Sequence, residues 1–205
     1  MMVYNNYLLE IQPLLKKACT ISKHMKKPIR IGLPLWQKVL QTVSKEKQFS
    51  RPATSDDLKR IIKSLNDQGA EYLLIGGYAL YTYGYHRATD DIDLLLPRGA
   101  DKAKPVIKAL LILEDRQSAN LDPAWFDEGD TIRLADEVVV DLMFTACGET
   151  FESLRSCMKQ IHIDGIPVKT LTLEGLLKTK QTVREKDLMD RQILEYAIDQ
   201  SKRNE

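Results

Sequence analysis

The sequence predicts an α/β (α+β) fold, with a small mixed β-sheet flanked by helices and a helical N-terminal extension. From residue 55 onward, short apolar runs bounded by turn residues alternate with segments of helical apolar spacing. Residues 1–50 also have helical spacing, but they carry nine Lys and Arg against two Glu, in a chain whose net charge is +1. A chain of 205 residues has room for one good-sized domain and such an appendage.

The N-terminal part of the sequence predicts two helices and a basic connector within residues 1–50, interrupted by Pro28 and Pro34. A linker at 50–54 precedes a helix that Ser55 caps and Gly69 terminates. The core is expected to continue in chain order with a strand at 72–75, a helix from Tyr78 to Tyr81, a strand at 92–96, a helix at 102–113, paired strands at 131–134 and 138–144, a hairpin at 161–168 that turns at Asp164-Gly165, and helices at 172–180 and 187–198. Pro167 is expected to confine its strand to a sheet edge.

Composition excludes several classes of protein. Apolar residues make up 43% and charged residues 29% of the chain, and no apolar run is long enough to cross a membrane. Residues 1–15 lack the pattern of a secretion signal, so a cytoplasmic location without membrane contact is expected. Cys19, Cys147 and Cys157 are odd in number and widely spaced, which argues against disulfides and a zinc site.

Two aspartates on one predicted strand carry the first chemical signal. Because side chains alternate along a strand, Asp91 and Asp93 share one face while Ile92 and Leu94 enter the core. Two carboxylates so close repel each other unless a cation lies between them, and Mg²⁺ prefers oxygen ligands. Asp141 adds a third carboxylate within an otherwise apolar strand, where a charge needs a partner or a metal.

Gly76-Gly77 supplies a second signal, because it lies between a strand and a helix. Free N–H groups at a helix start favour a phosphate there, and glycine allows a close approach; the same pair can also be a simple tight turn. The tyrosines at 78, 81, 83 and 85 offer either a surface for stacking a base or ordinary packing. No hydrolase motif or P-loop is present.

These motifs together resemble a known family. Gly76-Gly77, followed after thirteen residues by Asp91-Ile92-Asp93-Leu94 and later by Asp141, resembles the signature of the DNA polymerase beta-type nucleotidyltransferase superfamily. The segment from Arg87 through Thr89 to Asp93 is similar to the Arg-x-Thr-x-Asp-x-Asp form of its abortive-infection type toxin branch. Lys180, Arg184 and the segment from Lys186 to Asp190 resemble that branch's C-terminal elements.

The resemblance covers roughly residues 55–200 and implies a nucleotidyltransferase domain with C-terminal helices. It implies transfer of a nucleoside monophosphate from a nucleoside triphosphate, such as ATP, to a hydroxyl, with two Mg²⁺ ions. The implied catalytic residues are Asp91, Asp93, Asp141, Lys180 and Asp187, of which the first three hold metal. Gly76, Gly77, Arg87, Thr89 and Lys180 are the implied nucleotide-binding residues. Asp141 could act as base or only as ligand, and Asp190 competes with Asp187 for its role.

The acceptor is left open by the sequence. RNA such as tRNA and a protein side chain both fit the resemblance, as does control by a cognate antitoxin, and the basic residues of 1–50 favour RNA unless they form a solvated helix face. Two alternatives remain: an enzyme that modifies a small molecule such as an antibiotic, and a nucleotide-binding regulatory module without turnover.

Overall fold

A computed structural model describes residues 50–203 and confirms the predicted fold class, a mixed sheet flanked by helices. The predicted basic helices of residues 1–50 lie outside the described residues, apart from Ser50. The helices are α3 (Ser55–Asp67), α4 (Gly76–Tyr81), α5 (Ala100–Leu110), α6 (Trp125–Glu128), α7 (Leu173–Lys178) and α8 (Glu185–Arg203), with 3-10 turns η1 (Gln117–Asn120) and η2 (Arg155–Cys157). The strands are β1 (Leu73–Ile75), β2 (Asp91–Leu95), β3 (Ile132–Ala135), β4 (Val139–Met143), β5 (Thr145–Ala146), β6 (Glu149–Thr150), β7 (Met158–Ile163) and β8 (Ile166–Leu171).

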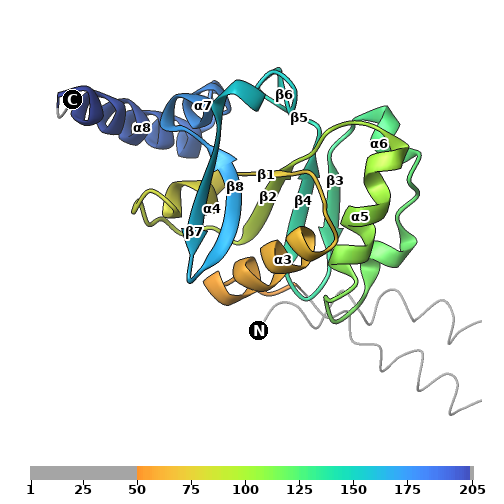
Figure 1. Cartoon of the computed structure of the whole chain (residues 1–205). Helices are drawn as coiled ribbons and strands as arrows, with labels where there is room; N and C mark the ends of the chain where they lie inside the picture. The colour runs from red at the N-terminus through yellow and green to blue at the C-terminus, as the bar shows by residue number, and fades with distance from the viewer. Residues whose placement is uncertain (1–49, 204–205) are drawn as a thin grey trace, which may run out of the picture. The chain divides into compact units, whose positions relative to one another are not determined.

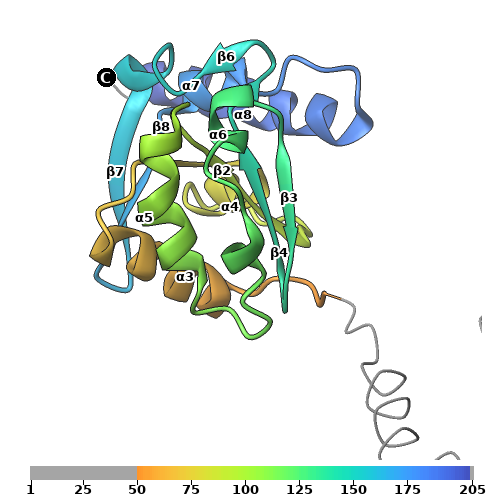
Figure 2. The same ribbon diagram turned by 90° about the vertical axis from the view of Figure 1, so that its right-hand side faces the viewer.

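The main sheet has six strands in the order β3-β4-β2-β1-β8-β7, and β5 and β6 form a separate small hairpin. β2 runs parallel to β4 and antiparallel to β1, so the sheet is mixed. Helices α3 and α5 pack together on one face of the sheet, and α4 lies on the opposite face (Figure 1). In the view turned by 90°, α5 faces the viewer and the main sheet lies behind it (Figure 2).

The hydrophobic core lies between the sheet and the layer of α3 and α5. Leu58, Ile61 and Leu65 of α3 are buried against it, and Ile92 and Leu94 of β2 have no exposed surface. Because strand side chains alternate, Asp91 and Asp93 of the same strand must face away from this core. The packing of β2 therefore assigns its carboxylates to the face that carries α4.

The N-terminal cap of α3 is Thr54, so the expectation that Ser55 caps this helix is wrong. Thr54 accepts a hydrogen bond from the Asp57 N–H, and the Asp57 carboxylate accepts one from the Thr54 N–H. This reciprocal arrangement satisfies two backbone donors that the helix leaves free. The sequence alone does not distinguish Thr54 from Ser55, because the hydroxyl of either residue can cap a helix. Thr54 is the cap because the Asp57 carboxylate lies three residues after it and completes the reciprocal pair.

Pro167 does not place its strand at an edge, which corrects the second local expectation. β8 lies between β1 and β7, and β7 is the edge strand. The proline is tolerated because β8 pairs with the short strand β1 at Leu74↔Thr170, beyond Pro167. The Pro167 carbonyl instead accepts a hydrogen bond of 2.7 Å from the Asn66 side chain of α3.

Most of the other expected elements are present within one or two residues of their predicted limits, including the Asp164-Gly165 hairpin turn and the Thr172 cap of α7. The last helix, α8, begins and ends further out than expected, at Glu185 and Arg203. Within residues 50–203, no helix combines the length and the apolar character that crossing a bilayer requires.

Candidate active site

Three carboxylates meet on neighbouring strands at the face that carries α4. Asp91 and Asp93 belong to β2 and Asp141 belongs to β4, and the parallel register pairs Asp93 with Asp141. Side chains at paired positions of adjacent strands point to the same face. The parallel pairing of β2 and β4 therefore brings together residues that are far apart in the chain.

Arg133 joins this group, although no motif in the sequence pointed to it. It lies on β3 opposite Asp141, and its Nη1 is 2.7 Å from Asp141 Oδ2 and 3.7 Å from Asp91 Oδ2. The alternation of Ile132, Arg133 and Leu134 shows only that Arg133 leaves the core face. The antiparallel register of β3 and β4 places Arg133 beside the carboxylates, and no local sequence pattern predicts this register.

The second oxygen of Asp141 has no partner. Among the buried side-chain oxygen and nitrogen atoms of residues 50–203, Asp141 Oδ1 is the one that has no hydrogen-bond partner. A buried carboxylate oxygen without a partner is costly, and a bound cation is a common way to satisfy it. The oxygen-only ligands of the group also fit the preference of Mg²⁺.

The carboxylates do not close around a common point in this arrangement, since residues 50–203 contain no group of three His, Cys, Asp or Glu side chains gathered as metal ligands. Arg133 provides the physical reason, because its guanidinium lies between Asp91 and Asp141 and supplies the positive charge there. The Arg133 side chain is 59% exposed, so it can turn away without breaking core packing.

We expect Arg133→Gln to bind Mn²⁺ about 3- to 10-fold more tightly than the wild type in the absence of nucleotide, because the guanidinium competes with the ion for two carboxylates and a half-exposed ion pair is weak. Isothermal titration with Mn²⁺ measures this, with Arg155→Gln as the control for loss of an exposed arginine. Equal affinity in Arg133→Gln and wild type would show that Arg133 does not occupy the cation position.

Asp93 is the most perturbed of the three carboxylates. Burial, followed by the charges of Asp91 and Asp141, raises the pKa of Asp93 to about 7. Burial also raises the pKa of Asp141, against the opposing effect of Arg133. The group therefore holds more negative charge than its surroundings balance, as expected where an enzyme binds cations.

Gly76 is required by the position of Asp93. Its φ is +71°, in the left-handed region, and a Cβ atom at this position would overlap the Asp93 carboxylate. Gly77 is required by a different contact, since its Cβ would lie 2.7 Å from Thr89 Cβ. The two glycines thus allow α4 to approach β2 and the loop before it, in addition to any role in phosphate binding.

A second ionic cluster lies where α8 meets the 86–89 loop. Lys180 Nζ lies 3.1 Å from Asp187 Oδ1 and 2.9 Å from Asp190 Oδ2. Arg87 donates two hydrogen bonds to Asp190, at 2.8 and 3.0 Å, and Asp190 has no exposed surface. Burial raises the pKa of Asp187, but hydrogen bonds from Thr182 and Lys180 outweigh it and leave that pKa below its usual value.

The alternatives Asp187 and Asp190 therefore have different places in one network. Asp190 is enclosed between two cations, whereas Asp187 keeps some exposure and borders a pocket. The sequence could not separate them, because both lie on the same helix one turn apart. Their distinct partners come from α8 packing against the 86–89 loop.

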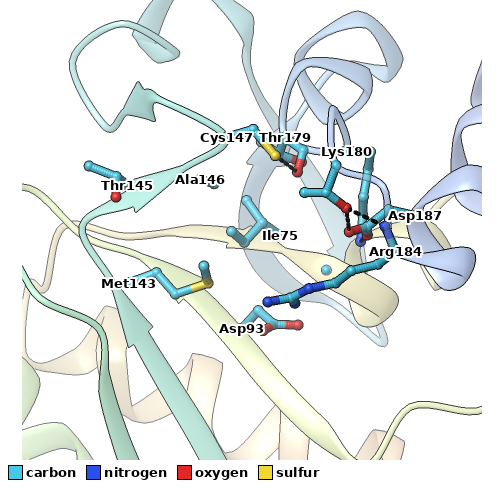
Figure 3. Close-up of a pocket in the computed structure, with 12 residues that line it drawn as sticks. Ile75, Asp93, Met143, Thr145, Ala146, Cys147, Thr179, Lys180, Arg184 and Asp187 are labelled. Carbon is cyan, nitrogen blue, oxygen red and sulfur yellow. Dashed lines mark hydrogen bonds and ion pairs between the residues drawn. The ribbon is translucent and has the colours of Figure 1, made fainter.

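A pocket of about 200 Å³ opens between Asp93 and this network. Asp93 and Gly76 form one wall, and Lys180, Arg184 and Asp187 line the other. Figure 3 shows the Arg184 side chain extending across the pocket toward Asp93. We call this space the donor pocket.

The residues implied for nucleotide binding are divided between two pockets. Gly76 and Lys180 line the donor pocket, whereas Gly77, Arg87 and Thr89 line a second pocket of about 340 Å³ on the other side of Arg87. The predicted catalytic residues Asp93, Lys180 and Asp187 border the donor pocket directly. Asp91 and Asp141 are not among the residues that line it; Asp91 lies two positions before Asp93 on β2, and Asp141 is paired with Asp93 across β2 and β4.

The tyrosines of 78–85 serve mainly as packing residues. Tyr78 is buried and donates a hydrogen bond to the Ala53 carbonyl, and Tyr83 donates one of 2.6 Å to the Leu171 carbonyl. Tyr81 differs, since its ring meets the His86 ring edge-on with centroids 4.7 Å apart at the second pocket.

Comparison with known proteins adds no relative: no family model matches the chain, and no curated protein matches it. The function is therefore inferred from the residues of this site.

Proposed function

We propose that this protein is a Mg²⁺-dependent nucleotidyltransferase that moves a nucleoside monophosphate from a nucleoside triphosphate to an acceptor hydroxyl. The observation that carries the proposal is the set of Asp91, Asp93 and Asp141 on adjacent parallel strands, with one buried oxygen of Asp141 unpartnered. Three carboxylates beside a pocket lined by Lys180 and Arg184 suit a reaction between polyanions.

Asp91, Asp93 and Asp141 would hold the metal ions. Mg²⁺ held there would supply positive charge that stabilises the charge developing on the phosphate oxygens and would lower the pKa of an attacking hydroxyl. The unpartnered Asp141 Oδ1 and the raised pKa of Asp93 support this assignment, because both reflect negative charge that these residues do not balance themselves.

The cationic side chains of the donor pocket would bind the triphosphate. The Lys180 ammonium has three N–H donors, of which two are directed at Asp187 and Asp190, so one remains for a phosphate oxygen. Within residues 50–203 the Arg184 side chain has no hydrogen bond or ion pair, and it lines the pocket, so its guanidinium suits bidentate binding of phosphate. Asp187 and Asp190 hold Lys180 in position and act through it.

The reaction is an in-line displacement at the α-phosphorus. A bond forms between the acceptor oxygen and the α-phosphorus while the bond from that phosphorus to the bridging oxygen of the β-phosphate breaks, so that pyrophosphate leaves. The hydroxyl proton passes to a carboxylate, and Asp141 is our candidate base because its buried Oδ1 has no hydrogen-bond partner among the described residues.

A cytoplasmic location, where nucleoside triphosphates and Mg²⁺ are both abundant, belongs to the same proposal. So does control by a cognate antitoxin, which the resemblance to the abortive-infection type branch suggests. The acceptor is RNA or a protein side chain in this proposal.

The test is incubation of the purified chain with each α-³²P-labelled nucleoside triphosphate, Mg²⁺ and total RNA or cell lysate. We expect label to move into the acceptor with the wild type and with the exposed-carboxylate control Asp101→Asn. Asp91→Asn and Asp141→Asn should reduce transfer at least about 100-fold, because each removes a charge that stabilises the transition state.

Equal rates of transfer by Asp91→Asn, Asp141→Asn and the wild type would show that these carboxylates take no part in the reaction. Mg²⁺-dependent nucleotide binding without transfer to any acceptor would favour a regulatory module, and transfer only to added small molecules would favour the antibiotic-modifying alternative.

A further inference from the structure

One side of helix α8 carries large apolar side chains that the domain leaves exposed. Met189 is 56% exposed and Tyr196 is 65% exposed, whereas Leu194 and Ile198 on the other side of the helix are buried. Met189 and Tyr196 are seven residues apart, close to two helical turns, so both side chains leave the helix on the same side. We call the side of α8 centred on Met189, Gln192 and Tyr196 its outer face. Large apolar side chains exposed together in this way mark a surface for association with another protein.

The outer face is separate from the donor pocket. Helix α8 packs against α7, and its Asp187 and Asp190 side chains contact Lys180. Tyr196 lies nine residues after Asp187, which is two and a half helical turns, so the two side chains lie on opposite sides of the helix. In Figure 1, α8 extends outward from the sheet, with the C-terminal end of the helix farthest from it. A partner on the outer face therefore does not cover the donor pocket.

The two ends of the outer face carry opposite charges. Glu185 lies in the first turn of α8, and Lys202 and Arg203 lie in its last turn; all three residues are exposed. Lys186 and Asp199, which are also exposed, repeat this arrangement with the signs reversed. Each charge near the start of the helix thus has an opposite charge near the end, with the apolar side chains between them.

A second copy of α8 that runs in the opposite direction is complementary to this pattern. With the two-fold axis midway between Met189 and Tyr196, Met189 lies against Tyr196 of the partner subunit. Glu185 then approaches the basic last turn of the partner helix, and Lys186 approaches Asp199 of the partner subunit. A parallel pair of helices would instead place each charge beside its own copy, which is unfavourable. The charges therefore favour a second copy of this chain in the antiparallel direction.

The size of the outer face predicts a weak dimer. Helix α8 has 19 residues, and a helix of this length is roughly 28 Å long. A single pair of such helices falls at the small end of specific interfaces, below about 1,200 Å² of total buried surface. We therefore expect a dissociation constant on the order of 10–100 μM.

We propose that this protein forms a two-fold symmetric dimer through the outer faces of two antiparallel α8 helices. Met189 packs on Tyr196 of the partner subunit at the centre, and ion pairs between the helix ends set the direction. The inference does not depend on the transferase activity. It gives α8 two roles, because the inner side of the same helix holds Lys180 through Asp187 and Asp190.

Sedimentation equilibrium of the full-length chain, from about 5 μM to about 200 μM, spans the expected dissociation constant. We expect Met189→Lys and Tyr196→Lys each to raise this constant at least about 10-fold, because each introduces a charge into the apolar centre and the two-fold symmetry repeats it. Met158→Lys is the matched control, since Met158 is an exposed methionine on β7. This control should dimerise like the wild type.

A crosslinking measurement on the wild type locates the contact without any substitution. A zero-length carbodiimide reagent joins a carboxylate to an ammonium group that it touches, and the products are mapped by mass spectrometry. Glu185 and Lys202 of one chain lie roughly 25 Å apart along α8, so a crosslink between them joins two chains. We expect this crosslink, and we expect its yield to rise with protein concentration.

Three results would overturn the dimer. The first is a wild type that remains monomeric up to about 200 μM, well above the expected dissociation constant. The second is a dimer that Met189→Lys and Tyr196→Lys weaken no more than Met158→Lys does, and the third is a dimer without the crosslink between Glu185 and Lys202. The last two would show that the chains associate through another surface. Each result leaves the transferase proposal intact, because nucleotidyl transfer is measured separately.

Discussion

Replacing Asp93 by asparagine should abolish nucleotidyl transfer and, at the same time, stabilise the folded protein above pH 7. The expected loss of activity is about 1000-fold, because the metal ions contribute several kcal/mol to transition-state stabilisation through this carboxylate. The expected gain in stability follows from the pKa of Asp93, which burial and the charges of Asp91 and Asp141 raise to about 7.

The direction of the pH dependence follows from proton binding. Well below pH 4, Asp93 is protonated in both the folded and the unfolded chain, so ionisation costs nothing. As the pH rises toward 7, the unfolded chain releases this proton while the folded chain retains it, and the wild type loses stability. Above pH 7 the full cost is present, on the order of 2–4 kcal/mol, and asparagine avoids it.

Urea unfolding of wild type and Asp93→Asn at pH 5 and pH 8, with a chelator present, measures this difference. The advantage of the variant should be clearly smaller at pH 5 than at pH 8, because the folded chain still keeps the proton on Asp93 at pH 5. Added Mg²⁺ should stabilise the wild type at pH 8 and have little effect on the variant. A variant that is less stable than the wild type at pH 8 would contradict the view of Asp93 as an unbalanced buried charge.

Replacing Asp190 by asparagine should destabilise the protein by about 3–5 kcal/mol, the usual cost of removing one partner from a buried ion pair. Asp190 has no exposed surface and holds both Arg87 and Lys180, so the substitution leaves Arg87 without its carboxylate and Lys180 with Asp187 alone. Transfer should fall as well, because Lys180 loses one of the two groups that orient it.

Unfolding free energies from urea titration separate Asp190→Asn from two comparisons on the same helix. Asp187→Asn should cost less, because the Asp187 side chain is 12% exposed whereas that of Asp190 has no exposed surface, and because its loss leaves Lys180 paired with Asp190. Asp199→Asn, at an exposed position of α8, should change stability by less than about 0.5 kcal/mol. A larger cost for Asp187→Asn than for Asp190→Asn would reverse the roles given to the two aspartates.

Local sequence patterns predicted the positions of helices and strands better than they predicted which residues contact one another. The apolar runs at 72–75, 92–96 and 138–144 gave strands within one or two residues of β1, β2 and β4, because burial of one or both faces leaves a strong periodic signal. The cap at Ser55 and the edge position of Pro167 were wrong. The cap depended on the reciprocal hydrogen bonds of Thr54 with the Asp57 carboxylate three residues later, a local contact that the sequence analysis missed. The position of the proline strand depended on pairing with the distant short strand β1.

The sequence by itself determined that Asp91 and Asp93 share one face, because side chains alternate along every strand whatever surrounds it. It also showed that Asp141 interrupts an apolar strand and needs a partner. The tertiary structure decided which partners these carboxylates have. The parallel register of β2 and β4 set Asp141 beside Asp93, the antiparallel register of β3 and β4 brought Arg133 to them, and the packing of α8 enclosed Asp190 between Arg87 and Lys180. Strand register and helix packing are set by the burial of side chains distant in the chain, so no local pattern of residues could reveal them.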